Sequence, residues 1–128
     1  MTNSTMNTFE FKAIPTFGIR DYKTAHDFYV DFLGFQIDWE HRFEPTGPVY
    51  LQISKNGLIL HLSESKRFEK NIIVFVETKN INGFHKELQE RNPNDKIQDV
   101  LQTKWKTLQL EIEDPFGNLL RFNENLLD

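Results

Sequence analysis

Hydrophobic and polar residues alternate along this chain in an order that occurs twice. The first occurrence begins with an alternating strand, continues with apolar residues every three or four positions, as in an amphipathic helix, and ends with three more strands. Asp21 is a favourable N-cap for the helix, Gly34 ends it, and Asn56-Gly57 is a strong signal for a tight turn. The predicted elements are residues 13–20, 22–34, 35–43 and the two strands of 49–64.

The same order returns after the short polar segment 65–70. Its predicted strand, helix and three strands are residues 71–78, 81–92, 95–102, 105–114 and 118–124. A linker this short does not separate independent domains. The repeat therefore predicts one α+β domain over residues 13–124, in which module one (13–64) and module two (71–124) each have the order βαβββ. Residues 1–12 are expected to form a flexible tail that leads into the first strand.

Composition and charge narrow the classes of function. The chain has no cysteine, so disulfides and thiolate chemistry are excluded, which fits the cytoplasm. Its net charge is -4 with Lys and Arg scattered, so a nucleic-acid partner is not expected. No apolar run has the length of about 18 residues that a membrane helix needs, and the N-terminus lacks the apolar core of a signal peptide. An acidic surface would attract a cationic small molecule.

A turn followed by a strand recurs in segments 55–64 and 114–124, and a polar residue stands four positions after the glycine of each turn. This residue is His61 in module one and Arg121 in module two, and alternation places both on the cleft side of their sheets. Glu111 on the neighbouring strand is the expected partner of Arg121, whereas an Arg121 without a partner would indicate an anionic ligand. For His61, the alternatives are a bond to a hydroxyl or carbonyl group of the protein and a bond to a ligand.

Two segments together carry a family resemblance: RDYKTAHDFYVDFLGF at 20–35 and DPFGNLLRFNE at 114–124. With the repeated order of elements, they make the chain similar to the glyoxalase / bleomycin-resistance / extradiol-dioxygenase superfamily from residue 13 to residue 124. The resemblance implies that each module curls its sheet into a half-barrel and that two modules face one another around a cleft. Because this fold hosts many functions, it does not by itself define the chemistry.

The resemblance also bears on metal binding. Metal-dependent members take one ligand from the first strand and one from the last strand of each module, and the matching positions here are Ile14, His61, Asn71 and Arg121. Isoleucine and arginine offer no ligand atom, and asparagine is a poor ligand for a transition metal. We therefore expect no metal and no other cofactor.

The metal-free branch that this chain most resembles is the bleomycin-resistance type, which sequesters a drug without chemical turnover. In that branch, two chains swap the ends of their modules to form a homodimer, and a proline like Pro15, six residues before Asp21, accompanies the swap. Flat cationic ligands are held there between aromatic rings, and Trp39 and Trp105 stand at the matching positions. The resemblance thus implies a homodimer that binds a small amphipathic, cationic ligand.

Alternation leaves the roles of both tryptophans open. Trp105 continues a polar row toward Glu111, so it either lines the groove or packs at the sheet edge. Trp39 shares parity with Ile37 and is either a core residue or a groove residue. The predicted ligand-binding residues are Trp39, His61, Trp105, Glu111 and Arg121, with no catalytic residue assigned. The alternative function is a lyase or isomerase of the glyoxalase or dioxygenase type, in which His61 and Glu111 would act as acid and base.

Overall fold

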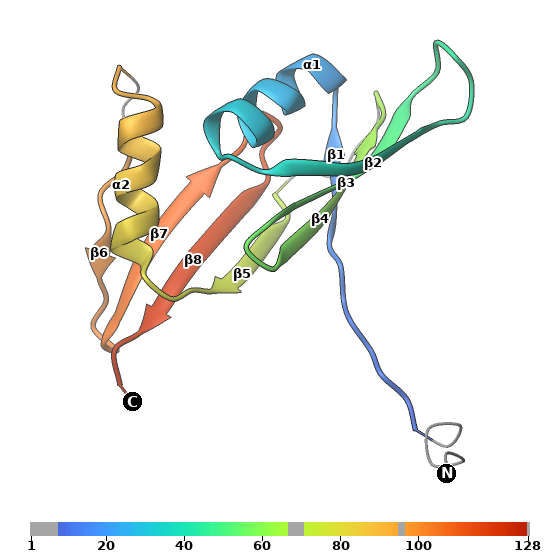
Figure 1. The fold of residues 1–128 in the computed structure, drawn as a ribbon. Coiled ribbons are helices and arrows are strands. Elements are labelled where there is room, and N and C mark those ends of the chain that lie inside the picture. The colour runs from blue at the N-terminus through green and yellow to red at the C-terminus, as the bar shows by residue number, and fades with distance from the viewer. Residues whose placement is uncertain (1–7, 67–70, 95–96, 128) are drawn as a thin grey trace.

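Two four-stranded sheets and their helices make up the computed structural model, which describes residues 8–66, 71–94 and 97–127 (Figure 1). Module one contains β1 (Thr16–Ile19), α1 (Tyr22–Ala25), the π-helical segment η2 (His26–Phe32), β2 (Gln36–Arg42), β3 (Val49–Lys55) and β4 (Leu58–Glu64). Module two contains β5 (Ile73–Glu77), α2 (Ile81–Arg91), β6 (Leu101–Gln102), β7 (Thr107–Glu113) and β8 (Leu119–Asn125). The predicted α+β class and the two βαβββ modules are confirmed.

The two sheets share one topology. Module one has the strand order β1-β4-β3-β2 and module two the order β5-β8-β7-β6, and in each the first strand is parallel to the last while the other pairs are antiparallel. We name them sheet A and sheet B. Pro15 immediately precedes edge strand β1, as expected of a residue with no backbone N–H to donate. Its carbonyl oxygen accepts a hydrogen bond from the His61 N–H at 2.9 Å.

Three predicted elements differ in detail from the structure. The helix expected at 22–34 has its predicted cap, because Asp21 Oδ1 accepts from the Thr24 N–H at 2.8 Å, but most of it is π-helical. The strand expected at 95–102 is reduced to β6, and its residues 95–96 lie outside the described part. The strand expected from Trp105 begins at Thr107, because Lys106 has a φ of 65° in a turn that precedes β7.

The two modules are joined through the DPFGN turn. Asp114, which is only 5% exposed, accepts a hydrogen bond from the Tyr29 hydroxyl of η2 at 2.6 Å. It also accepts from the backbone N–H groups of Phe116 and Asn118, both at 2.8 Å. The Asn118 side-chain amide donates to the Gly18 carbonyl of β1 at 3.2 Å. A turn of module two is therefore held by two elements of module one, and both sheets contribute to one core.

Residues 8–15 precede β1 and run away from the body of the protein (Figure 1). Phe9 and Phe11 on this arm are 82% and 92% exposed, and their rings stack at a centroid distance of 6.2 Å. The first seven residues of the expected tail lie outside the described part, and the division at residues 12 and 13 stays a prediction. Within the described ranges, no helix is long and apolar enough to cross a membrane.

Candidate functional site

The face of sheet A opposite its buried residues carries an aromatic and polar cluster. His61 on β4 is opposite Gln52 on β3, and Gln52 is opposite Trp39 on β2. The tight turn at Asn56-Gly57 sets the first of these pairings, because it puts Lys55 opposite Leu58 and so determines every later pair. Tyr50, two residues before Gln52, points to the same face.

Trp39 reaches this face because of an irregularity in β2. Ile37 pairs with Ile53, but Trp39 pairs with Gln52, so Asp38 is an extra residue and the register shifts there. The parity that linked Trp39 to Ile37 is therefore broken, and the core alternative is wrong, while a role for Trp39 in a groove stays a prediction. The Trp39 indole is 42% exposed, nearly parallel to the Tyr50 ring at 6.0 Å and 15°, and edge-on to His61 at 5.3 Å.

Both ring nitrogens of His61 have partners within the protein. Nδ1 lies 2.8 Å from the Tyr50 hydroxyl oxygen, and Nε2 lies 3.0 Å from Gln52 Oε1. The Gln52 amide nitrogen donates in turn to Asp38 Oδ2 at 3.0 Å, and Ser54 Oγ donates to Asp38 Oδ1 at 2.9 Å. These contacts match the alternative in which His61 is satisfied by the protein.

Acidic groups near Trp39 divide between the two faces of sheet A. Hydrogen bonds from Gln52 and then Gln36 lower the pKa of Asp38, so this carboxyl is ionised at neutral pH beside the cluster. Glu40 pairs with the buried Leu51 and points to the other face, where it accepts a hydrogen bond from the Tyr22 hydroxyl. Burial, and then this bond, raises the pKa of Tyr22 to about 12.

Sheet B carries the other two strand residues of the predicted site. Arg121 on β8 is opposite Glu111 on β7, and Arg121 Nε donates to Glu111 Oε2 at 2.6 Å. The expected pairing is confirmed, and it removes the argument for an anionic ligand at an unpaired arginine. On the neighbouring strand β5, Phe75 is paired with Arg121 and is 56% exposed, and Ile73 is 54% exposed.

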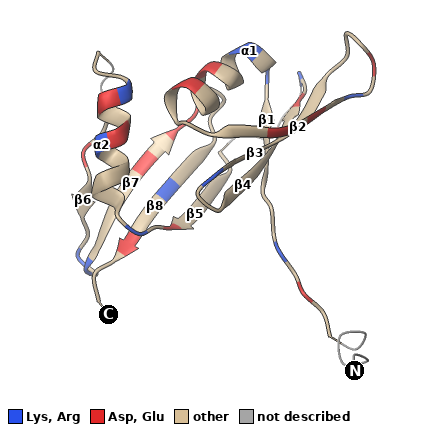
Figure 2. Ribbon diagram, in the orientation of Figure 1, with Lys and Arg blue, Asp and Glu red and all other residues tan. Residues whose placement is uncertain are grey.

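The other Lys and Arg residues are scattered over the protein (Figure 2).

Trp105 is separated from both groups. It lies in the turn between β6 and β7, where the Thr107 N–H donates to Thr103 Oγ1 at 3.0 Å, and it is 64% exposed. The structure thus brings Trp39 together with His61 and Glu111 together with Arg121. Within the described part of one chain, no hydrogen bond or ring contact joins these two pairs to one another or to Trp105. Their roles in ligand binding stay predictions.

The residues at the family's metal positions do not fit a metal ion. The register places Thr16, rather than Ile14, beside His61, and Phe75, rather than Asn71, beside Arg121. Phenylalanine has no ligand atom, arginine carries a positive charge, and both His61 nitrogens already have partners. Elsewhere in the described ranges, one group of three side chains has potential metal-ligand atoms that all lie within 4.8 Å of one another. These residues are on the helical segment of module one: His26, Asp27 and Asp31.

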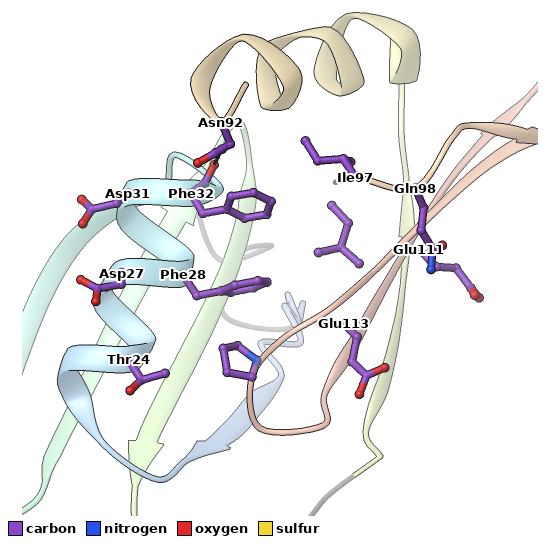
Figure 3. Close-up of a pocket in the computed structure, with 12 residues that line it drawn as sticks. Thr24, Asp27, Phe28, Asp31, Phe32, Asn92, Ile97, Gln98, Glu111 and Glu113 are labelled. Carbon is purple, nitrogen blue, oxygen red and sulfur yellow. Dashed lines mark hydrogen bonds between the residues drawn. The ribbon is translucent and has the colours of Figure 1, made fainter. Parts of the chain in front are cut away.

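A cavity of about 670 Å³ lies between η2 and β7, away from the cluster on sheet A. Phe28 and Phe32 point into it, whereas Asp27 and Asp31 point away from it (Figure 3). Glu111 contributes to its wall, but its carboxylate points away from the cavity and is bound to Arg121. This space therefore presents the two phenylalanine rings, while the carboxylates of Asp27, Asp31 and Glu111 face away from it.

Sequence reasoning missed Tyr50 and Gln52, which hold His61. A signal for both was present, because a two-residue turn at Asn56-Gly57 places Gln52 directly opposite His61. Tyr50 then follows two positions away on the same face. The hairpin register, rather than residue type, identifies these two positions.

A glyoxalase superfamily family model matches residues 2–127, and the chain belongs to this superfamily. A search of curated proteins finds no match. Among solved structures, a bleomycin-binding protein complexed with bleomycin superposes with a TM-score of 0.69 at 19% identity, covering 91% of this chain and 99% of that one.

Two further structures show the same fold. The bleomycin-binding protein from Streptomyces verticillus, complexed with copper(II)-bleomycin, has a TM-score of 0.67 at 20% identity and covers 90% of this chain and 96% of that one. A glyoxalase-related enzyme from Clostridium phytofermentans has a TM-score of 0.71 at 18% identity, covering 93% and 98%. At these identities the likeness shows the fold alone, which drug-binding proteins and enzymes share.

Proposed function

We propose that the protein binds a flat, amphipathic and cationic drug of the bleomycin type and sequesters it unchanged in the cytoplasm. The observation that carries this proposal is the half-exposed Trp39 indole, held nearly parallel to Tyr50 and next to the ionised Asp38. An aromatic ring can stack on the indole, and a cation over its face gains about 0.5–2 kcal/mol. Asp38 adds an attraction that weakens as salt is added.

A second copy of the chain would complete the groove. Phe75 and Ile73 leave apolar surface exposed beside the Glu111–Arg121 pair, and Phe9 and Phe11 are exposed on the arm. Large apolar side chains left exposed on an edge strand, as Ile73 and Phe75 are on β5, are typical of a surface that a partner covers. In such a homodimer, the cluster on sheet A would face sheet B and Trp105 of the partner subunit, which would explain why one chain does not unite the predicted residues.

The contacts favour binding over catalysis. An acid–base pair of His61 and Glu111 would need a free nitrogen on the histidine and an unengaged carboxylate. His61 is instead bound at both nitrogens, and Glu111 is bound to Arg121. The lyase or isomerase alternative therefore has less support than sequestration.

Titration with bleomycin tests the proposal. Tryptophan fluorescence should be quenched and should saturate near one drug per chain. By calorimetry, Trp39→Ala should weaken binding by about tenfold, equivalent to about 1.4 kcal/mol, and Trp105→Ala should weaken it similarly. Phe43→Ala is a matched control, because Phe43 is 74% exposed near the end of β2, outside the cluster. Equal affinity in the wild type and the Trp39→Ala/Trp105→Ala double variant would contradict the assignment of these rings.

A further inference from the structure

We infer that Tyr50 determines ligand specificity as a hydrogen-bond acceptor, so that the site selects flat aromatic ligands that carry an N–H donor. The inference rests on the proposed function in one respect: the ligand ring must lie on Trp39. Each hydrogen bond in the cluster has one direction. That direction follows step by step from the carboxylate of Asp38.

The first step is the orientation of the Gln52 amide. Asp38 accepts hydrogen bonds from Gln36 Nε2 and Ser54 Oγ at 2.9 Å each, as well as from Gln52 Nε2 at 3.0 Å. An ionised carboxylate accepts and does not donate, so the Gln52 NH₂ group must face Asp38. The amide oxygen of Gln52 then faces His61, as the 3.0 Å contact to Nε2 requires.

The second step is the position of the proton on His61. An amide oxygen only accepts, so the imidazole must carry its hydrogen on Nε2. A neutral imidazole with this tautomer has its lone pair on Nδ1. The Tyr50 hydroxyl, 2.8 Å away, therefore donates its proton to Nδ1.

The Tyr50 hydroxyl oxygen is then left as an acceptor for a ligand. Because the Tyr50 proton is committed to His61, the hydroxyl oxygen presents lone pairs, to which Thr16 Oγ1 at 3.4 Å is the other neighbour in the protein. The Tyr50 ring lies nearly parallel to the half-exposed indole of Trp39. A ring stacked on Trp39 thus meets an acceptor at the Tyr50 hydroxyl, whereas the Asp38 carboxylate is already engaged by Gln36, Gln52 and Ser54. A ligand with an N–H group at its edge is favoured over one with only an acceptor there.

The direction of the bonds is tested directly by long-range ¹H–¹⁵N NMR on protein with labelled histidine. At about pH 8, His61 should show a protonated Nε2 and an unprotonated Nδ1. His61→Gln serves to assign its resonances. A proton on Nδ1 would overturn the inference whatever the protein binds, because the Tyr50 hydroxyl would then be free to donate.

The selectivity is tested with indole and benzofuran, which are neutral rings of matching shape that differ in an N–H group and an oxygen atom. Binding is followed by the shift of the Trp39 Nε1–H resonance. The wild type should prefer indole by about two- to tenfold, the range of one net hydrogen bond. Tyr50→Phe should bind both equally, and His61→Phe, which keeps the hydroxyl but frees its proton, should lose most of the preference.

The outcomes separate this inference from the proposed function. Equal affinity of the wild type for both probes, or a preference that survives in Tyr50→Phe, would overturn the role of Tyr50. Bleomycin binding could still stand in either case. No shift of the Trp39 resonance with either probe would also overturn the role of Tyr50. Failure of the bleomycin titration, with the indole preference present, would instead contradict the drug assignment alone.

Discussion

Removal of the Asp114 carboxylate should destabilise the protein more than any change at the ligand cluster. Four donors point at this buried group: the Tyr29 hydroxyl, the backbone N–H groups of Phe116 and Asn118, and the Asn118 side-chain amide. In Asp114→Ala, the hydroxyl and the two backbone N–H groups lose this acceptor inside the core, and the Asn118 amide keeps only its bond to the Gly18 carbonyl. Each unsatisfied buried donor costs about 1–3 kcal/mol, and local relaxation should limit the total to about 3–5 kcal/mol.

Urea unfolding at a fixed protein concentration measures this loss, with the slope of the transition compared among variants. Tyr29→Phe removes one hydrogen bond to the same group and should cost about 1.5–3 kcal/mol. Tyr50→Phe is the matched control, because it deletes a hydroxyl on a partly exposed face and should cost less than about 1 kcal/mol. A stability of Asp114→Ala within about 1 kcal/mol of the wild type would refute the view that this turn joins the modules.

Three further predictions follow from described contacts. Protein purified without chelator should hold less than stoichiometric zinc, nickel or iron; one tightly bound ion beside His61 would contradict this. Sedimentation should show a dimer at micromolar concentration, and Phe75→Ser should shift it toward the 15.2 kDa monomer; a wild-type monomer would remove the shared groove. Burial, and then the Asp114 carboxylate, raises the pKa of Tyr29. The contribution of the Tyr29 hydroxyl to the free energy of unfolding is therefore complete below about pH 10 and is lost as pH rises further. An equal loss of stability at alkaline pH in Tyr29→Phe would argue against this.

Much of the fold was predictable because local signals agree with the tertiary structure. Alternation predicted the strands, and the Asn56-Gly57 turn predicted the β3–β4 hairpin. The Glu111–Arg121 pair was predictable for a related reason, because adjacent strands place two opposite charges on one face. Each of these features depends on a regular period of two.

The site was harder to predict because it lies where that period is interrupted. An extra residue at Asp38 turns Trp39 to the opposite face, and apolar alternation does not reveal such a bulge. Lys106 adopts a left-handed conformation that favours glycine, so the strand expected to include Trp105 starts after it. The hydrogen bonds of His61 also required the register of two strands, which pattern analysis of either strand alone does not supply.

Recovery of the drug after binding tests the central claim most directly. The protein is incubated with an equal amount of bleomycin, the mixture is assayed for DNA cleavage, and the protein is then denatured and the released drug is analysed by mass spectrometry. Sequestration predicts that cleavage is suppressed while the protein is folded and that the drug is recovered with its mass and full cleavage activity unchanged. A drug of altered mass would show chemical turnover, and cleavage that is not suppressed would show that the protein does not sequester this ligand.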